Sequence, residues 1–176
     1  MRVLAAICLC FLTAVPLAAQ VDTRNDPLSP DQQDQIAEAG IDPVARVDLF
    51  VKFLNERADT IQGLIKRAKS PARSQRLAGE LQQFGALMDE LGDNLDMYSQ
   101  RKADLRKSLR GLNEGVRRWQ TVLQDLPSEA GFEVSLKNAL MSASDLFTQS
   151  KQLASDQEAY FKAHPDQKGQ DRYEPQ

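Results

Sequence analysis

An unbroken apolar heptad pattern between residues 77 and 126 constrains the fold more than any other feature of this chain. Steps of four and three alternate along it for seven heptads, and Lys102 is its only charged member. This spacing places one stripe along an α-helix and is typical of helices that pack side by side. The stripe comprises Leu77, Leu81, Phe84, Met88, Leu91, Leu95, Tyr98, Lys102, Leu105, Leu109, Leu112, Val116, Trp119, Leu123 and Leu126.

The same stripe leaves two layouts open. A loop need not preserve the phase of a repeat, and no Pro, Gly or Asn lies between Leu95 and Arg110. The pattern therefore favours one continuous helix over residues 72–126, roughly 80 Å long. Lys102 would then lie where two partner helices meet, within reach of Asp42, Asp156 or Glu158. The alternative is a turn at 99–104 that contains Lys102 and produces a compact four-helix bundle.

Helix start signals divide the rest of the chain. Ser29-Pro30 and Asp42-Pro43 each combine a capping side chain with a proline suited to the first helical position. We expect a short leading helix at 30–39 and long helices at 43–68 and 131–163. The prediction is an all-α domain over residues 29–163. It is an antiparallel, coiled-coil-like bundle of three long helices, or four if the longest one breaks.

Apolar residues beside the main stripes are too many for a two-helix rod to bury. We therefore expect either a compact bundle or a second copy that covers them. Gly85 and Gly92, seven residues apart, would permit close approach of a neighbouring helix. The flanking apolar residues are Phe50, Phe53, Leu87, Met97, Val122, Leu140 and Phe147.

The first nineteen residues have the pattern of a secretory signal peptide. Arg2 precedes an uncharged apolar run, which is followed by small residues up to Ala19. We expect cleavage after Ala19. An uncleaved membrane anchor is the alternative. We expect a linker at 20–28, a disordered tail at 164–176, and no stable membrane span after cleavage. The predicted location is the periplasm or the exterior of the cell.

Residue types exclude many chemistries from the predicted mature chain. Both cysteines, Cys8 and Cys10, lie in the signal segment, and the single histidine, His164, begins the tail. Neither a thiolate nor a His-based metal site can be built from them, and no Ser/His/Asp set is available. We expect no cofactor and no enzymatic activity. The net charge of −3 gives no attraction for nucleic acid.

Charge divides the region of the long stripe in two. Residues 80–96 hold five acidic and no basic residues, with Asp89, Asp93 and Asp96 on one side of the helix. Residues 101–118 hold seven basic and two acidic residues. The basic candidates for a binding site are Arg101, Lys102, Arg106, Lys107, Arg110, Arg117 and Arg118.

Two interpretations fit the basic group. It could bind an anionic envelope ligand, such as a phosphate-bearing polymer or lipid, or it could pair with neighbouring helices or a second copy. The second interpretation is favoured because charged helix surfaces are ordinary. We expect a non-catalytic exported protein that acts by binding a protein partner or by forming a homo-dimer. A periplasmic chaperone or stress protein is the alternative, which would need an exposed concave apolar surface.

Overall fold

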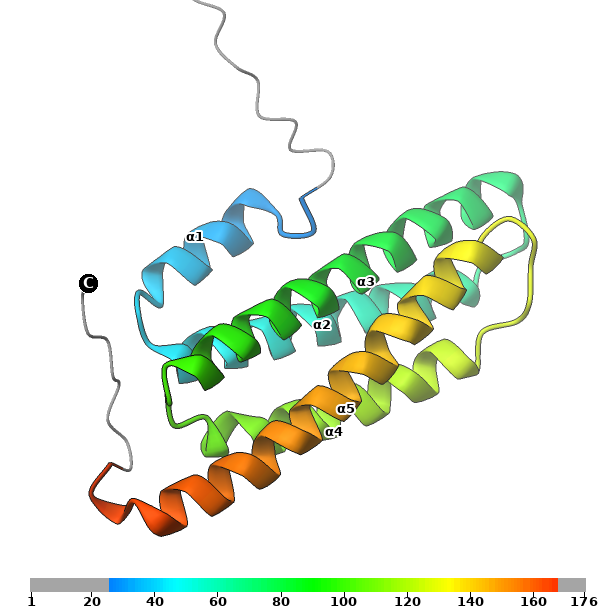
Figure 1. The fold of residues 1–176 in the computed structure, drawn as a ribbon. Helices are drawn as coiled ribbons and strands as arrows, with labels where there is room; N and C mark the ends of the chain where they lie inside the picture. The colour runs from blue at the N-terminus through cyan, green and yellow to red at the C-terminus, as the bar shows by residue number, and fades with distance from the viewer. Residues whose placement is uncertain (1–25, 168–176) are drawn as a thin grey trace, which may run out of the picture.

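The computed structural model describes residues 26–167, which form five α-helices, one 3₁₀ turn and no strand (Figure 1). The all-α prediction is confirmed. The predicted signal peptide, most of the predicted linker and residues 168–176 lie outside the described part. The elements are α1 (Pro30–Glu38), α2 (Pro43–Ile65), α3 (Pro71–Gln100), α4 (Arg106–Gln124), α5 (Glu133–Ala163) and η2 (Pro165–Gln167).

Helices α1 and α2 begin where the start signals place them, and α3 begins one residue before the predicted residue 72. Ser29 and Gln32 form a reciprocal capping box at α1, and Asp42 accepts hydrogen bonds from two backbone N–H groups at the start of α2. Ser70 caps α3 in the same way through the N–H of Arg73. A proline follows each cap at the first helical position, where its missing N–H costs nothing.

Helices α2 to α5 form a four-helix bundle in which α3 and α4 each pack against both α2 and α5. Helices α2 and α4 run in the same direction, since Ser108 hydrogen-bonds to Val44 and Trp119 to Asn55. Helices α3 and α5 are also parallel, as Figure 1 shows. Helices α2 and α3 form one antiparallel pair, and α4 and α5 form the other. Because α2 and α5 are the neighbours of α3 in the bundle and α4 is not, the α3–α4 connection crosses the diagonal of the bundle.

The predicted stripe forms the centre of the core. Apart from Lys102, every member is at most 9% exposed. The rings of Phe84 and Trp119 meet edge to face across the diagonal, with centroids 6.2 Å apart. Trp119 also donates its indole N–H to the side-chain oxygen of Asn55 at 2.9 Å. Four of the flanking residues, Phe50, Phe53, Leu87 and Val122, are buried too, which agrees with the compact alternative.

The favoured continuous helix over 72–126 is wrong. Helix α3 ends at Gln100 and α4 begins at Arg106. Lys102 adopts a left-handed conformation with φ of 58°. Its N–H donates to the carbonyl of Ser99 at 3.0 Å, and the N–H of Ala103 donates to that of Tyr98 at 3.1 Å. These two bonds form a Schellman motif, in which glycine is the usual left-handed residue. Lysine in that position gives no sequence signal of a helix end.

The helix break also escapes detection because it preserves the phase of the stripe. Tyr98 before the turn and Leu105 after it are seven residues apart and both buried. Gln157 of α5, only 5% exposed, holds the turn. It accepts from the N–H of Leu105 and donates to the carbonyl of Ala103, both at 2.8 Å.

The predicted surroundings of Lys102 are corrected as well. Its side chain is exposed, and its Nζ lies 5.3 Å from the centre of the Tyr160 ring. No ion pair between Lys102 and Asp42, Asp156 or Glu158 occurs among residues 26–167. The reason is the turn itself, which removes Lys102 from the stripe and turns its side chain outward.

Both ends of the described chain are attached to the bundle. Leu28 is buried, and the carbonyl of Pro27 accepts a 2.7 Å hydrogen bond from Arg57, so the end of the predicted linker is docked. At the other end, the His164 ring stacks on Tyr160 at 4.4 Å. The turn η2 follows, within the segment predicted to be a disordered tail.

Candidate functional site

The surface between the parallel helices α3 and α5 contains two hollows, and two exposed apolar side chains lie beside it on the outer face of α5. The helices approach closely here, as expected from the two glycines. A Cβ atom at Gly85 would lie 3.6 Å from the Cα of Ala139, and the carbonyl of Gly92 accepts a hydrogen bond from Gln149 at 2.9 Å. We call the seam between these helices the α3–α5 groove; it includes the hollow beside Gly131 and the hollow beside Gln149.

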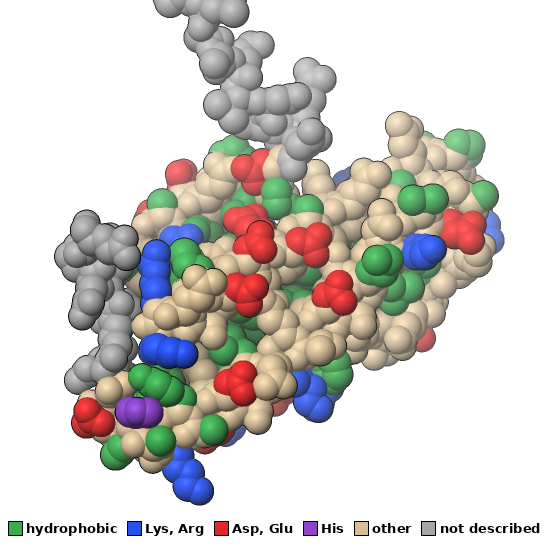
Figure 2. Space-filling view, in the orientation of Figure 1, with side chains coloured by type: hydrophobic (Ala, Val, Ile, Leu, Met, Phe, Trp, Pro, Cys, Tyr) green, Lys and Arg blue, Asp and Glu red, His purple; other side chains and the backbone are tan. Residues whose placement is uncertain are grey.

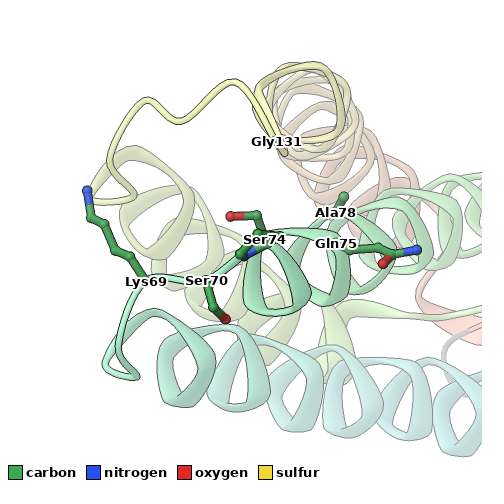
Figure 3. Close-up of a pocket in the computed structure, with 7 residues that line it drawn as sticks. Lys69, Ser70, Ser74, Gln75, Ala78 and Gly131 are labelled. Atoms are coloured by element: carbon green, nitrogen blue, oxygen red, sulfur yellow. The ribbon is translucent and has the colours of Figure 1, made fainter.

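The first hollow lies where α3 and α5 begin and has a volume of about 620 Å³. Figure 3 shows Ser74 and Ala78 of α3 facing the segment at Gly131, while Lys69 extends outward from the preceding loop. A Cβ atom at Gly131 would lie only 2.8 Å from the Cβ of Ser74, so this contact requires glycine. The lining residues are Lys69, Ser70, Pro71, Ser74, Gln75, Ala78 and Gly131.

A buried arginine fixes the loops that border this hollow. Arg73, 6% exposed, donates to the carbonyls of Ile65 and Arg67 at the end of α2, and to the carboxylate of Glu129 before α5. Lys69 also pairs with Glu129 at 3.2 Å. The hydrogen bond from Arg73, assisted by Lys69, lowers the pKa of Glu129. One ionic cluster therefore ties the α2–α3 and α4–α5 loops together.

The second hollow, of about 190 Å³, is strongly acidic. Its carboxylates are Asp89, Asp93 and Asp96 of α3 and Asp145 of α5, and Figure 2 shows acidic side chains gathered on this face. Asp96 accepts a 2.7 Å hydrogen bond from the Gln149 amide. None of the four forms an ion pair with a Lys or Arg in the described range. The hollow therefore presents uncompensated negative charge to solvent.

Two exposed apolar side chains lie on the outer face of α5, and neither lines one of the hollows. Val134 is 73% and Met141 57% exposed, and Ile41 is the only other exposed large apolar residue in the described part. Seven residues apart on α5, Val134 and Met141 share one face. Met141 lies one helical turn before Asp145, which lines the acidic hollow. Neither residue was predicted as part of a site because both lie off the stripe.

The predicted basic residues do not form a single site. Arg101 and Lys102 lie in the turn, and Arg106 folds back onto Asp104 and over the Phe161 ring, 4.7 Å from its centre. The hydrogen bond to Asp104 raises the pKa of Arg106. Arg118 pairs with Asp59 of α2. For Arg106 and Arg118, pairing within the fold is the interpretation that the contacts support.

The other three basic residues share one exposed face of α4. Lys107, Arg110 and Arg117 are exposed and form no ion pair among the described residues. Helix α4 lies across the bundle diagonal from α3, so this face is separate from the acidic hollow. Trp119 and Tyr98 are buried in the core and are not available for stacking on a ligand.

The described residues contain no candidate metal site. No group of three or more His, Cys, Asp or Glu side chains there is placed to hold a metal ion. The Nδ1 atom of His164 lies 2.9 Å from the carbonyl oxygen of Tyr160, so the ring is engaged locally. None of the described helices combines the length and the apolar character needed to cross a membrane.

Comparison with known proteins adds no relative: no family model, curated protein or solved structure matches this chain.

Proposed function

We propose that this is an exported, non-catalytic helical protein that binds another protein through the outer face of α5 and the adjoining α3–α5 groove. The exposure of Val134 and Met141 on the outer face of α5 carries the proposal. Nearly every other large apolar side chain among residues 26–167 is buried or partly buried in the core. Fully burying a side chain of this kind is worth about 1.5–3 kcal/mol, which favours a partner that covers both.

The charge of the groove supports a selective contact. The carboxylate of Asp145 lies one helical turn from Met141, and Asp89 and Asp93 line the same hollow as Asp145. Uncompensated charge beside an apolar contact accelerates encounter with complementary partners and disfavours others. Export is supported by the signal-like pattern of residues 1–19. The non-catalytic assignment rests on the residue types available to the chain.

Site-specific photo-crosslinking in the source cell tests the proposal. We expect a photoreactive residue replacing Met141 to yield a covalent adduct with one other protein, and the adduct to disappear when Asp89 and Asp93 are changed to Asn. The matched control is the same probe at Thr121, which is equally accessible on α4. Equal adducts from both positions, or none from Met141, would refute groove binding. An uncleaved protein retained inside the cell would refute export.

Binding of an anionic polymer is a second candidate, favoured by Lys107, Arg110 and Arg117 on α4. Their charges are unpaired within the described residues, so they could neutralise phosphates. Inorganic polyphosphate is a suitable probe. We expect binding to weaken as salt rises and to fall at least tenfold when all three residues are changed to Gln. The control variant carries Lys66→Gln, Arg67→Gln and Arg76→Gln instead, and we expect it to bind polyphosphate as tightly as the unchanged protein. Equal losses of affinity in the two triple variants would exclude a specific face.

A further inference from the structure

We propose that two copies of this chain form a domain-swapped dimer in which residues 101–105 become helical and join α3 and α4 into one helix. In the swapped dimer, the α2–α3 hairpin of one copy packs against the α4–α5 hairpin of the other. The partner is a second copy of this chain because the swapped dimer uses the same contacts between the two hairpins that hold the monomer together. This inference does not depend on what the α3–α5 groove binds.

The first support is the phase of the buried stripe. Tyr98 and Leu105 are buried on either side of the turn, one heptad apart. A straight helix through the turn would therefore keep every buried position of α3 and α4 on one stripe. The residues between them, Ser-Gln-Arg-Lys-Ala-Asp, include no helix breaker.

The second support is conformational strain at the hinge. Lys102 is the only non-glycine residue with positive φ in the described part of the chain. The left-handed conformation is unfavourable for a residue with a Cβ atom, and straightening the turn would relieve it. Short hinges under strain favour exchange of elements between copies.

The third support is the division of the bundle into two hairpins. Helices α2 and α3 are one antiparallel pair and α4 and α5 are the other, and only residues 101–105 join them. Because α3 and α4 are antiparallel on the diagonal, two straightened α3–α4 helices related by a twofold axis reproduce that arrangement twice. Contacts such as Phe84 with Trp119 then form between copies instead of within one. The joined helix, residues 71–124, would be roughly 80 Å long.

Two features hold the chain as a monomer. Gln157 bonds to the N–H of Leu105 and the carbonyl of Ala103, which would instead bond within the straightened helix. In the dimer the two Lys102 side chains would approach the twofold axis, where like charges repel. We therefore expect the dimer to be favoured by high protein concentration and high salt.

Substitutions at the hinge test the proposal because they act in opposite directions. Purified full chains are refolded at millimolar concentration, and the products are separated by size and weighed by light scattering. Lys102→Ala favours helix and disfavours the turn, whereas Lys102→Gly does the reverse. Each dimer has two hinges, so we expect the dissociation constants of these variants to differ by about 100-fold or more. Gln157→Met, which removes the clamp, should also raise the dimer fraction.

A distance measurement separates a swapped dimer from side-by-side association. Spin labels are placed at Ala86 and Thr121 in a chain carrying Cys8→Ser and Cys10→Ser, and the labelled chain is refolded with excess unlabelled chain. In the monomer the two exposed labels lie on opposite sides of one bundle, at the level of the Phe84–Trp119 contact, so only the width of the bundle separates them. In a swapped dimer they are separated by 35 helical residues, about 50 Å. A dimer that keeps the short distance, equal dimer fractions in all variants, or monomers throughout would each overturn the proposal.

Discussion

Replacing Gln157 by Met tests the structural role of the α3–α4 turn. Methionine has a similar length and volume, so the substitution removes the amide while leaving little cavity. The N–H of Leu105 and the carbonyl of Ala103 then lose partners 2.8 Å away in a buried place. Each unsatisfied buried group costs roughly 1–3 kcal/mol. We expect the free energy of unfolding to fall by about 2–5 kcal/mol.

The assay is thermal and urea unfolding at a protein concentration where light scattering shows only monomer. For a domain of this size the loss corresponds to a fall in Tm of about 6–15 °C. The control is Gln152→Met on the same helix, where the exposed amide bonds only to Asp156. Its effect should stay within about 0.5 kcal/mol.

Amide hydrogen exchange localises the effect. In Gln157→Met the amide of Leu105 should exchange much faster, while amides at the centre of α3 should change only by the global loss of stability. Equal free energies of unfolding for Gln157→Met and Gln152→Met would refute the role of Gln157 in holding the turn. So would unchanged protection of Leu105, because a continuous helix would supply that amide with a carbonyl of its own.

Two further predictions concern other parts of the bundle. Lys102→Val should be less stable than Lys102→Gly by about 1–2 kcal/mol in the free energy of unfolding, because a β-branched side chain suits the left-handed conformation poorly. Its urea midpoint should therefore be lower, and equal midpoints would contradict the strain at the hinge. Since the fold lowers the pKa of Glu129 below 4.5, its contribution to stability is present above that pH and is lost as the pH falls through the folded value. Glu129→Gln should therefore lower Tm at pH 7 and flatten the fall of Tm in acid, and parallel curves for the two proteins would count against the Arg73 contact.

Local chemistry made much of this fold predictable. Ser29 and Asp42 cap helices next to prolines, and these short-range signals placed two helix starts at the residues observed. The stripe identified the core because burial depends on spacing. The end of α3 was not predictable, since the left-handed residue is Lys102 and the turn keeps the heptad phase. Its partner, Gln157, lies far along the chain.

The site was less predictable than the fold. Asp89, Asp93 and Asp96 were recognised as one side of a helix, but Asp145 joins them only because α3 and α5 are parallel neighbours. That pairing depends on a diagonal connection, which no local signal encodes. The basic residues were predicted as a group from their order in the sequence. The fold disperses them between the turn, a local pair with Asp104 and the outer face of α4.

Parallel neighbours also give the α3–α5 groove an electrical direction. In a bundle of alternating helices, the peptide dipoles of adjacent helices oppose and largely cancel. Here both walls begin beside Gly131 and run the same way, so their dipoles add. A helix that settled into the groove would meet two aligned fields, and the antiparallel orientation would be preferred by about 0.3–1 kcal/mol for each helix end involved. The topology therefore encodes which way round a helical ligand would lie.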